Sequence, residues 1–155
     1  MSYRPNSELV AVAWLGSMSG VLQSMVSTLL PRDNSTWATS GFITVGDGTG
    51  RGAAVIGGAP ILNSQVRHPV LSIHTWAVNI GSAKPPWGLA CSLAEKIVDS
   101  VFDEDNMRRT LTLPTGYQGA RVNGATCTEP RRVPGDSGAY AHYSIDLNLY
   151  WVPLP

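Results

Sequence analysis

The stretch that decides the fold runs from Arg67 to Phe102 and reads RHPVLSIHTWAVN, then IGSAKP, then PWGLACSLAEKIVDSVF. The first part has a period of two and is rich in β-branched and aromatic residues, which predicts a strand. Because both sides of this strand are largely apolar, we expect a central strand that is covered on both faces. One side carries Leu71, Ile73, Thr75 and Ala77, and the other carries Val70, Ser72, His74, Trp76 and Val78.

The last part of the same stretch has the period of an amphipathic helix. Pro85 or Pro86 suits its first turn, where a missing N–H is not needed. We expect the apolar side to pack on the sheet, where each large buried side chain contributes roughly 1.5–3 kcal/mol. This side comprises Trp87, Ala90, Cys91, Ala94, Ile97, Val98, Val101 and Phe102.

The segments before this stretch are less clear. Asn6 or Ser7 can cap a helix that begins at Glu8. Residues 21–30 fit either a helix or a strand. Residues 37–45 alternate as a strand does, and residues 37–56 are the candidate for a hairpin around the glycine-rich loop Gly46–Gly52.

The segments after the helix indicate more strands. Residues 110–113 and 117–128 have strand character, and residues 129–138 form a loop with two prolines and two glycines. The last segment alternates most clearly, which predicts a half-buried antiparallel strand. Its inward side is Ala141, Tyr143, Ile145, Leu147, Leu149 and Trp151.

The composition bounds the class of protein. The chain has 155 residues, the size of one domain, and formal net charge zero. The net charge argues against a dedicated nucleic-acid binder and against a polybasic membrane anchor. The apolar runs are too short to span a bilayer, and the first residues do not have the pattern of a signal peptide. Charged residues are only 14%, which indicates either a loop-rich domain or a subunit whose surface is covered by neighbours.

No set of residues predicts catalysis, so we expect a protein that is not an enzyme. Gly135–Gly138 resembles the nucleophile motif of chymotrypsin-like proteases, and His74 and Asp103 precede it in the family's order. Ala139 and the surroundings of His74 do not match that family, and a single αβ unit does not match its two β-barrels. The glycine loop Gly46–Gly52 matches neither a phosphate loop nor a dinucleotide fingerprint.

Cysteine and histidine usage predicts neither a metal site nor a cofactor. Cys91 and Cys127 are expected to be free thiols, because the chain has no signal of an oxidising compartment. His68, His74 and His142 lack the spacing of metal ligands. We expect His74 to be a histidine of the core whose hydrogen bonds are satisfied.

Two charge clusters have two interpretations each. Asp103, Glu104 and Asp105 follow the helix, where each carboxylate costs about 0.3–1 kcal/mol against the helix dipole. They are therefore either a solvated helix end or residues kept for a contact outside the fold. Arg131, Arg132, Arg108 and Arg109 are either individually solvated or salt-bridged, or together they form a basic patch. In the second case, ion pairs between subunits are favoured over phosphate binding, since acidic residues balance the charge.

Three strings resemble the tail terminator proteins of long-tailed bacteriophages: residues 68–77, 87–102 and 130–151. In that family a strand is followed by a linker, a helix, a proline-bounded loop and a last strand that begins with an aromatic residue. The resemblance implies a single α+β domain over residues 1–155, with a mixed or antiparallel sheet and helices packed on one face.

The resemblance also implies a function. Such proteins form a ring, usually hexameric, on the head-proximal end of the tail tube, end tube polymerisation and contact the head completion (stopper) protein. DNA passes through the lumen without specific binding, and the protein belongs to the virion after assembly in the host cytoplasm. The alternatives are a stopper, a head–tail adaptor or a tail-tube-like subunit, a generic binding domain, and an enzyme built on Ser137.

Under this interpretation the expected functional residues lie at contacts or in the lumen. Negative charge in the lumen would keep DNA from binding, and unchanged DNA ejection after reversal of the acidic cluster would count against that placement. The loops Gly46–Gly52 and Glu129–Gly138 would lie at ring or axial contacts. The candidate residues are Gly48, Arg51, Asp103, Glu104, Asp105, Arg131 and Arg132.

Overall fold

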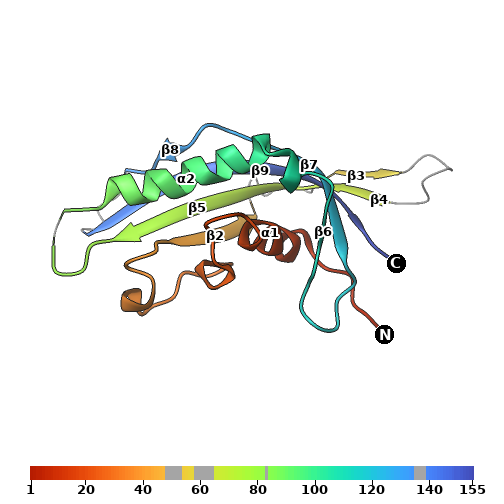
Figure 1. Ribbon diagram of the computed structural model, residues 1–155, viewed down its shortest axis with the longest axis horizontal. Coiled ribbons are helices and arrows are strands. Elements are labelled where there is room, and N and C mark those ends of the chain that lie inside the picture. Colours follow the sequence, from red (N-terminus) through yellow and green to blue (C-terminus); the bar gives the residue numbers. More distant parts are fainter. Residues whose placement is uncertain (48–53, 58–64, 83, 135–138) are drawn as a thin grey trace.

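The computed structural model describes residues 1–47, 54–57, 65–82, 84–134 and 139–155 (Figure 1). Two α-helices, nine strands and three short 3-10 turns are assigned there. The helices are α1 (Ser7–Gly16) and α2 (Trp87–Phe102), and the 3-10 turns are η1 (Gln23–Met25), η2 (Asn34–Thr36) and η3 (Glu104–Asn106). The strands are β1 (Val26–Ser27), β2 (Phe42–Asp47), β3 (Ala54–Gly57), β4 (Gln65–His68), β5 (Val70–Val78), β6 (Arg109–Leu111), β7 (Ala120–Cys127), β8 (Arg131–Arg132) and β9 (Tyr140–Pro153).

The strands form one mixed sheet around β5 and β9. The main order is β1-β2-β5-β9-β4-β3, while β7 and β8 also pair with β9, and β6 pairs with β7. β1 and β2 run parallel, and the other pairs of named strands are antiparallel within the described residues. β5 and β9 pair over nine positions, from Val70 opposite Asn148 to Val78 opposite Tyr140. The α+β class predicted from the sequence is therefore confirmed.

Both helices pack on one face of this sheet. The buried residues of α1, together with Ala94 and Ile97 of α2, belong to one core cluster with inward residues of β2, β5 and β9. α2 runs along β5 and β9, and α1 lies against β2 (Figure 1). The indole of Trp14 in α1 donates to the carbonyl of Asn106, just after α2, at 3.1 Å. The predicted alternation of β5 and β9 is confirmed, since Leu71, Ile73, Ile145 and Leu147 are all buried.

Small residues bring the first half of α2 close to the sheet. Ala77, Ala90 and Ala141 are fully buried against one another. The hydroxyl of Thr75, itself fully buried, donates to the carbonyl of Ala90 at 2.8 Å. A buried hydroxyl with a partner avoids the cost of an unsatisfied donor, so this bond fixes where α2 sits on the strand.

The predicted buried side of α2 is wrong at its last residue. Phe102 is 81% exposed, whereas Leu93, which was not expected on that side, is buried. The reason is geometric: Phe102 follows the fully buried Ile97 by five positions, which at 3.6 residues per turn places it well off the buried stripe. Leu93 lies three residues after Ala90 and four before Ile97, so it is on that stripe.

Two predictions about strands are also corrected. The strand expected across residues 67–79 is divided at Pro69, which has no N–H to donate to the ladder, into β4 and β5. The hairpin expected over residues 37–56 does not form, because β2 pairs with β1 and β5, while β3 pairs with β4. Residues 37–41 precede β2 and follow the 3-10 turn that Asp33 caps.

Other local predictions are confirmed. The Asn6 side chain caps α1 by accepting from the N–H of Leu9 at 2.8 Å. Residues 21–30, for which the sequence left helix and strand open, form neither throughout: they contain the 3-10 turn η1 and the short strand β1. Cys91 and Cys127 are both free thiols.

Gly41 is the position where the loop before β2 most needs a missing side chain. Its φ is +75°, and an added Cβ would lie 2.4 Å from Cδ1 of Leu93 and 3.0 Å from the carbonyl oxygen of Trp76. We predict that Gly41→Ala lowers the free energy of unfolding by about 2–4 kcal/mol in urea denaturation, from the left-handed backbone and the clash together. Gly88→Ala is the control: its Cβ meets open space within α2, and it should stabilise by up to ~1 kcal/mol. An unchanged midpoint for Gly41→Ala would contradict this packing.

Candidate interaction surface

The face of the sheet opposite the helices carries all three histidines. The ring of His68 stacks on Tyr150, with centroids 4.1 Å apart, and that of His142 stacks on Trp76 at 3.8 Å. His74 lies beside His142, with ring centroids 4.7 Å apart. The side chains of this face are only partly buried along the middle of β5, so the expectation of full cover on both sides holds for the helix face alone. We call this surface the histidine face.

Hydrogen bonds order the centre of the histidine face. Nδ1 of His74 and Nε2 of His142 are 2.5 Å apart, so one ring donates and the other accepts. Nε2 of His74 lies 2.9 Å from the hydroxyl of Ser72, and the indole of Trp76 donates to the hydroxyl of Thr44 at 3.0 Å. The expected satisfied histidine is therefore confirmed at His74, although it lies on the side of the sheet away from the main core.

This arrangement favours neutral imidazoles. Burial lowers the pKa of His74, against a smaller raising effect of Asp146. Burial, and then the neighbouring His74, lower the pKa of His142 to about 4. The pair therefore presents uncharged, aromatic and hydrogen-bonding groups near neutral pH.

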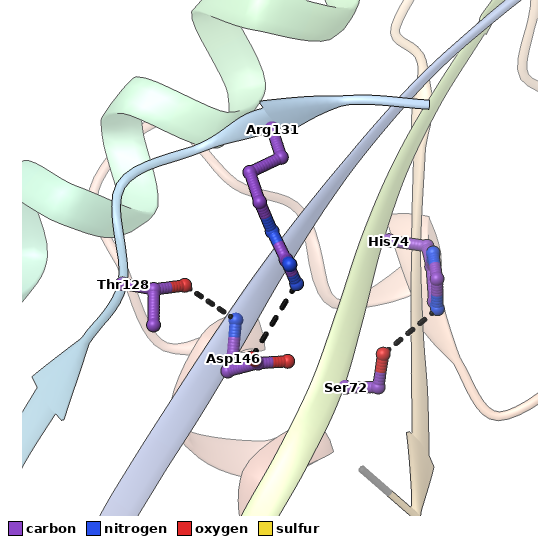
Figure 2. A network of polar contacts seen from close by, with 5 residues as sticks. All are labelled: Ser72, His74, Thr128, Arg131 and Asp146. Carbon is purple, nitrogen blue, oxygen red and sulfur yellow. Dashed lines mark hydrogen bonds and ion pairs between the residues drawn. The ribbon is translucent and has the colours of Figure 1, made fainter. Parts of the chain in front are cut away.

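Arg131 and Asp146 join β8 to the same face (Figure 2). Nη2 of Arg131 is 3.4 Å from Oδ2 of Asp146, and the hydroxyl of Thr128 accepts from the N–H of Asp146 at 3.0 Å. Figure 2 shows these groups beside the Ser72–His74 pair on the neighbouring strand. Because the Arg131 side chain is 64% exposed, the ion pair contributes little to stability and its guanidinium remains accessible.

Arg132 points to the opposite side of β9. Its guanidinium carbon lies 3.9 Å from the ring centroid of Trp87, in a cation–π contact at the beginning of α2. The Trp87 ring in turn meets Tyr143 edge-on at 6.1 Å. Both predicted arginines therefore have partners within the chain.

The four arginines do not form one patch. Arg131 on β8 pairs with Ser144 of β9. Arg109 on β6 pairs with Val122 of β7, and Val122 in turn pairs with Trp151 of β9. Seven residues of strand separate the two positions on β9, roughly 23 Å. Arg109 instead donates to the carbonyl and hydroxyl oxygens of Ser17.

The acidic cluster has a local role. Asp103 ends α2, and its carboxylate accepts from the N–H of Asp105 at 3.0 Å, which caps the turn η3. Asp103, Glu104 and Asp105 are all exposed.

The remaining predicted residues lie outside the described residues: Gly48, Arg51 and the protease-like segment Gly135–Gly138, which includes Ser137. His74 is bonded to Ser72 and His142, not to Asp103.

A groove of about 530 Å³ lies between α2 and the end of β7. Val98, Val101 and the exposed Phe102 line it from the helix, and Ala125, Cys127 and Pro130 line it from the other side. Glu95 and Glu129 are also among its lining residues. The sequence did not predict this surface, because it requires two segments to meet and because Phe102 was expected in the core. The signal available for this groove was the row of carboxylates beside apolar residues in the second half of the helix.

The described residues hold no group of three or more His, Cys, Asp and Glu side chains that could bind a metal ion. In the same part of the chain, neither helix combines the length and the apolar composition that crossing a membrane requires.

Comparison with known proteins identifies a shared fold. No family model matches the chain, and no curated protein matches it. Among solved structures, it is similar to a chain of the structure described as "Virion of native gene transfer agent (GTA) particle". The TM-score is 0.50 and the identity 11%, over 96% of this chain and 87% of that chain. The two chains share a fold. At this identity, the similarity extends to the arrangement of the elements and no further.

The histidine pair predicts a loss of stability in acid. Unfolded His142 titrates near pH 6.5 and folded His142 near 4, so the unfolded chain binds more protons between these values. The free energy of unfolding should therefore fall as the pH drops from about 6.5 to 4, by about 1–2 kcal/mol after allowance for solvent screening at this half-buried site. Thermal melts across this range measure it. His142→Phe should flatten the slope, and an unchanged slope in this variant would contradict the assignment.

Proposed function

We propose that this chain is a structural protein of a phage-like virion. The observation that carries the proposal is the fold shared, over nearly the whole of both chains, with a component of a gene transfer agent virion. The low content of charged residues supports it, because a subunit enclosed by neighbours has less need of a charged surface.

Within the virion, we propose the role of a tail terminator. The three strings that resemble that family include all or nearly all of β5, α2 and β9, the elements at the centre of the fold. The chain would form a hexameric ring on the head-proximal end of the tail tube and block addition of further tube subunits. Its other surface would contact the head completion protein, while DNA passes through the lumen.

This mechanism is steric and needs neither bond chemistry nor a cofactor. A ring closes when one surface of each subunit meets a different surface of the next. The chain has two different ends along its longest axis: the β3–β4 hairpin extends at one, and the turn between β5 and α2 forms the other (Figure 1). Such asymmetry favours head-to-tail contacts. The exposed acidic turn at Asp103–Asp105 remains our candidate for a surface that faces DNA.

The second candidate is another neck or tube component: a tail-tube-like subunit, a stopper or a head–tail adaptor. The β3–β4 hairpin favours the tube-like subunit, because an arm of this kind can extend the sheet of a neighbour.

Assembly of particles without this chain distinguishes these roles. A terminator limits tube length, so we predict that its omission gives headless tubes of excessive and variable length in electron micrographs, and that adding the purified chain restores uniform length. Absence of tubes would instead indicate a tube subunit. Tubes of normal length separated from heads would indicate a stopper or adaptor, and normal complete particles would contradict a structural role.

A further inference from the structure

The charges along helix α2 are arranged opposite to what its dipole favours, with cations near its beginning and carboxylates near its end. Its first turn has no acidic residue and its last turn no basic residue, although the dipole favours both. Lys84 precedes the helix and Arg132 lies over Trp87 at its beginning. Its second half carries Glu95, Lys96 and Asp99, a net charge of −1, and Asp103 follows its end. The isolated helix gains nothing from this order of charges, but two such helices placed end to end attract each other.

The basic end of α2 also carries an exposed apolar residue. Ile80, in the turn between β5 and α2, is 56% exposed, and Lys84 is exposed four residues later. No aspartate or glutamate occurs from residue 79 to residue 94, so this end has no carboxylate of its own segment to pair with Lys84. The amide of Asn79 donates to the carbonyl of Lys84 at 3.3 Å, which holds the turn together. We call Ile80 and Lys84 the tip.

The acidic end of α2 has the complementary shape and charge. The groove between α2 and β7 is apolar along Val98, Val101 and Phe102, and it includes the carboxylates of Glu95 and Glu129. Among the residues that the structure describes, no lysine or arginine lines it. Exposed Phe102, at 81%, is the largest apolar side chain of the lining and is left without cover in the single chain.

We propose that the tip of one copy docks in the groove of the next, with Ile80 against Phe102 and Val98 and with Lys84 beside Glu95 and Glu129. This inference rests on the proposed ring, and it assigns the contact that builds it. The occupant is a second copy because the same chain presents the matching cation and apolar residue at the other end of the same helix. A tip and a groove at opposite ends give a heterologous contact, which can close into a ring.

A native thiol allows a direct test. Cys127 lines the groove, and Ile80→Cys places a second thiol on the tip. Cys91→Ser removes the remaining thiol and keeps a hydroxyl toward Tyr143. Burial, and then Glu95, raise the pKa of the Cys127 thiol, so oxidation is best performed at alkaline pH. We expect a ladder of disulfide-linked oligomers on a non-reducing gel, formed at least ~tenfold faster than in the controls, because docking gives the two thiols a high effective concentration.

Two controls define the contact. Thr115→Cys, in an exposed turn, replaces Ile80→Cys in the same background and should give only slow random linkage. Ile80→Cys with Cys127→Ser should give no ladder, and linkage that persists there would indicate a symmetric tip-to-tip contact and overturn the proposal. Lys84→Glu should slow linkage about threefold, as expected for an exposed ion pair, and Glu95→Lys added to it should restore the rate.

The outcomes separate this contact from the proposed function. Rings on tube ends that show no linkage between the tip and Cys127 would overturn the contact and leave the terminator role standing. Linked rings that do not bind tube ends would support the contact and overturn the terminator role.

Discussion

The antiparallel pairing of β5 with β9 is the constraint on which the rest of the structure depends. Its register places Leu71, Ile73 and Thr75 under α2 and places His74 and Trp76 on the other face. Because side chains alternate along a strand, a slip of one residue would expose the apolar set and bury the imidazoles. The two strands lie far apart in the sequence, so their pairing closes a long loop at a cost in chain entropy. Helix α2 lies between them in the chain and covers the pair.

The same pairing produces two surfaces of different character. On one face, alanines and the bond from Thr75 to the carbonyl of Ala90 bring the beginning of α2 close to the sheet, while Val98 and Val101 of its second half remain only partly buried beside β7. That difference leaves a groove at one end of the helix. On the other face, the paired histidines and the stacked Trp76 are polar and uncharged, and the Arg131–Asp146 ion pair lies beside them.

The sequence predicted the elements whose burial is periodic and missed those whose partners are distant. β5, α2 and β9 each bury one side, so their periods identified them and most of their inward residues, although Leu93 of α2 was missed. The β3–β4 hairpin has no such signal, because its strands are short and Pro69 joins one of them directly to β5. Phe102 was wrongly placed in the core because it is apolar, although its position five residues after Ile97 lies well off the buried stripe. Arg131 and Arg132 are exposed, and their partners Asp146 and Trp87 lie on other elements, so the sequence did not predict these contacts.

We propose that this chain functions as a ring on the end of a tail tube. The most direct test is the mass of the purified protein by light scattering, alone and with tail tubes added. We predict a hexamer, or a monomer that becomes a ring only when tube ends are present. A monomer that ignores tube ends at every concentration would contradict it, and labelling of Ser137 with a serine-reactive phosphonate would then be the next measurement.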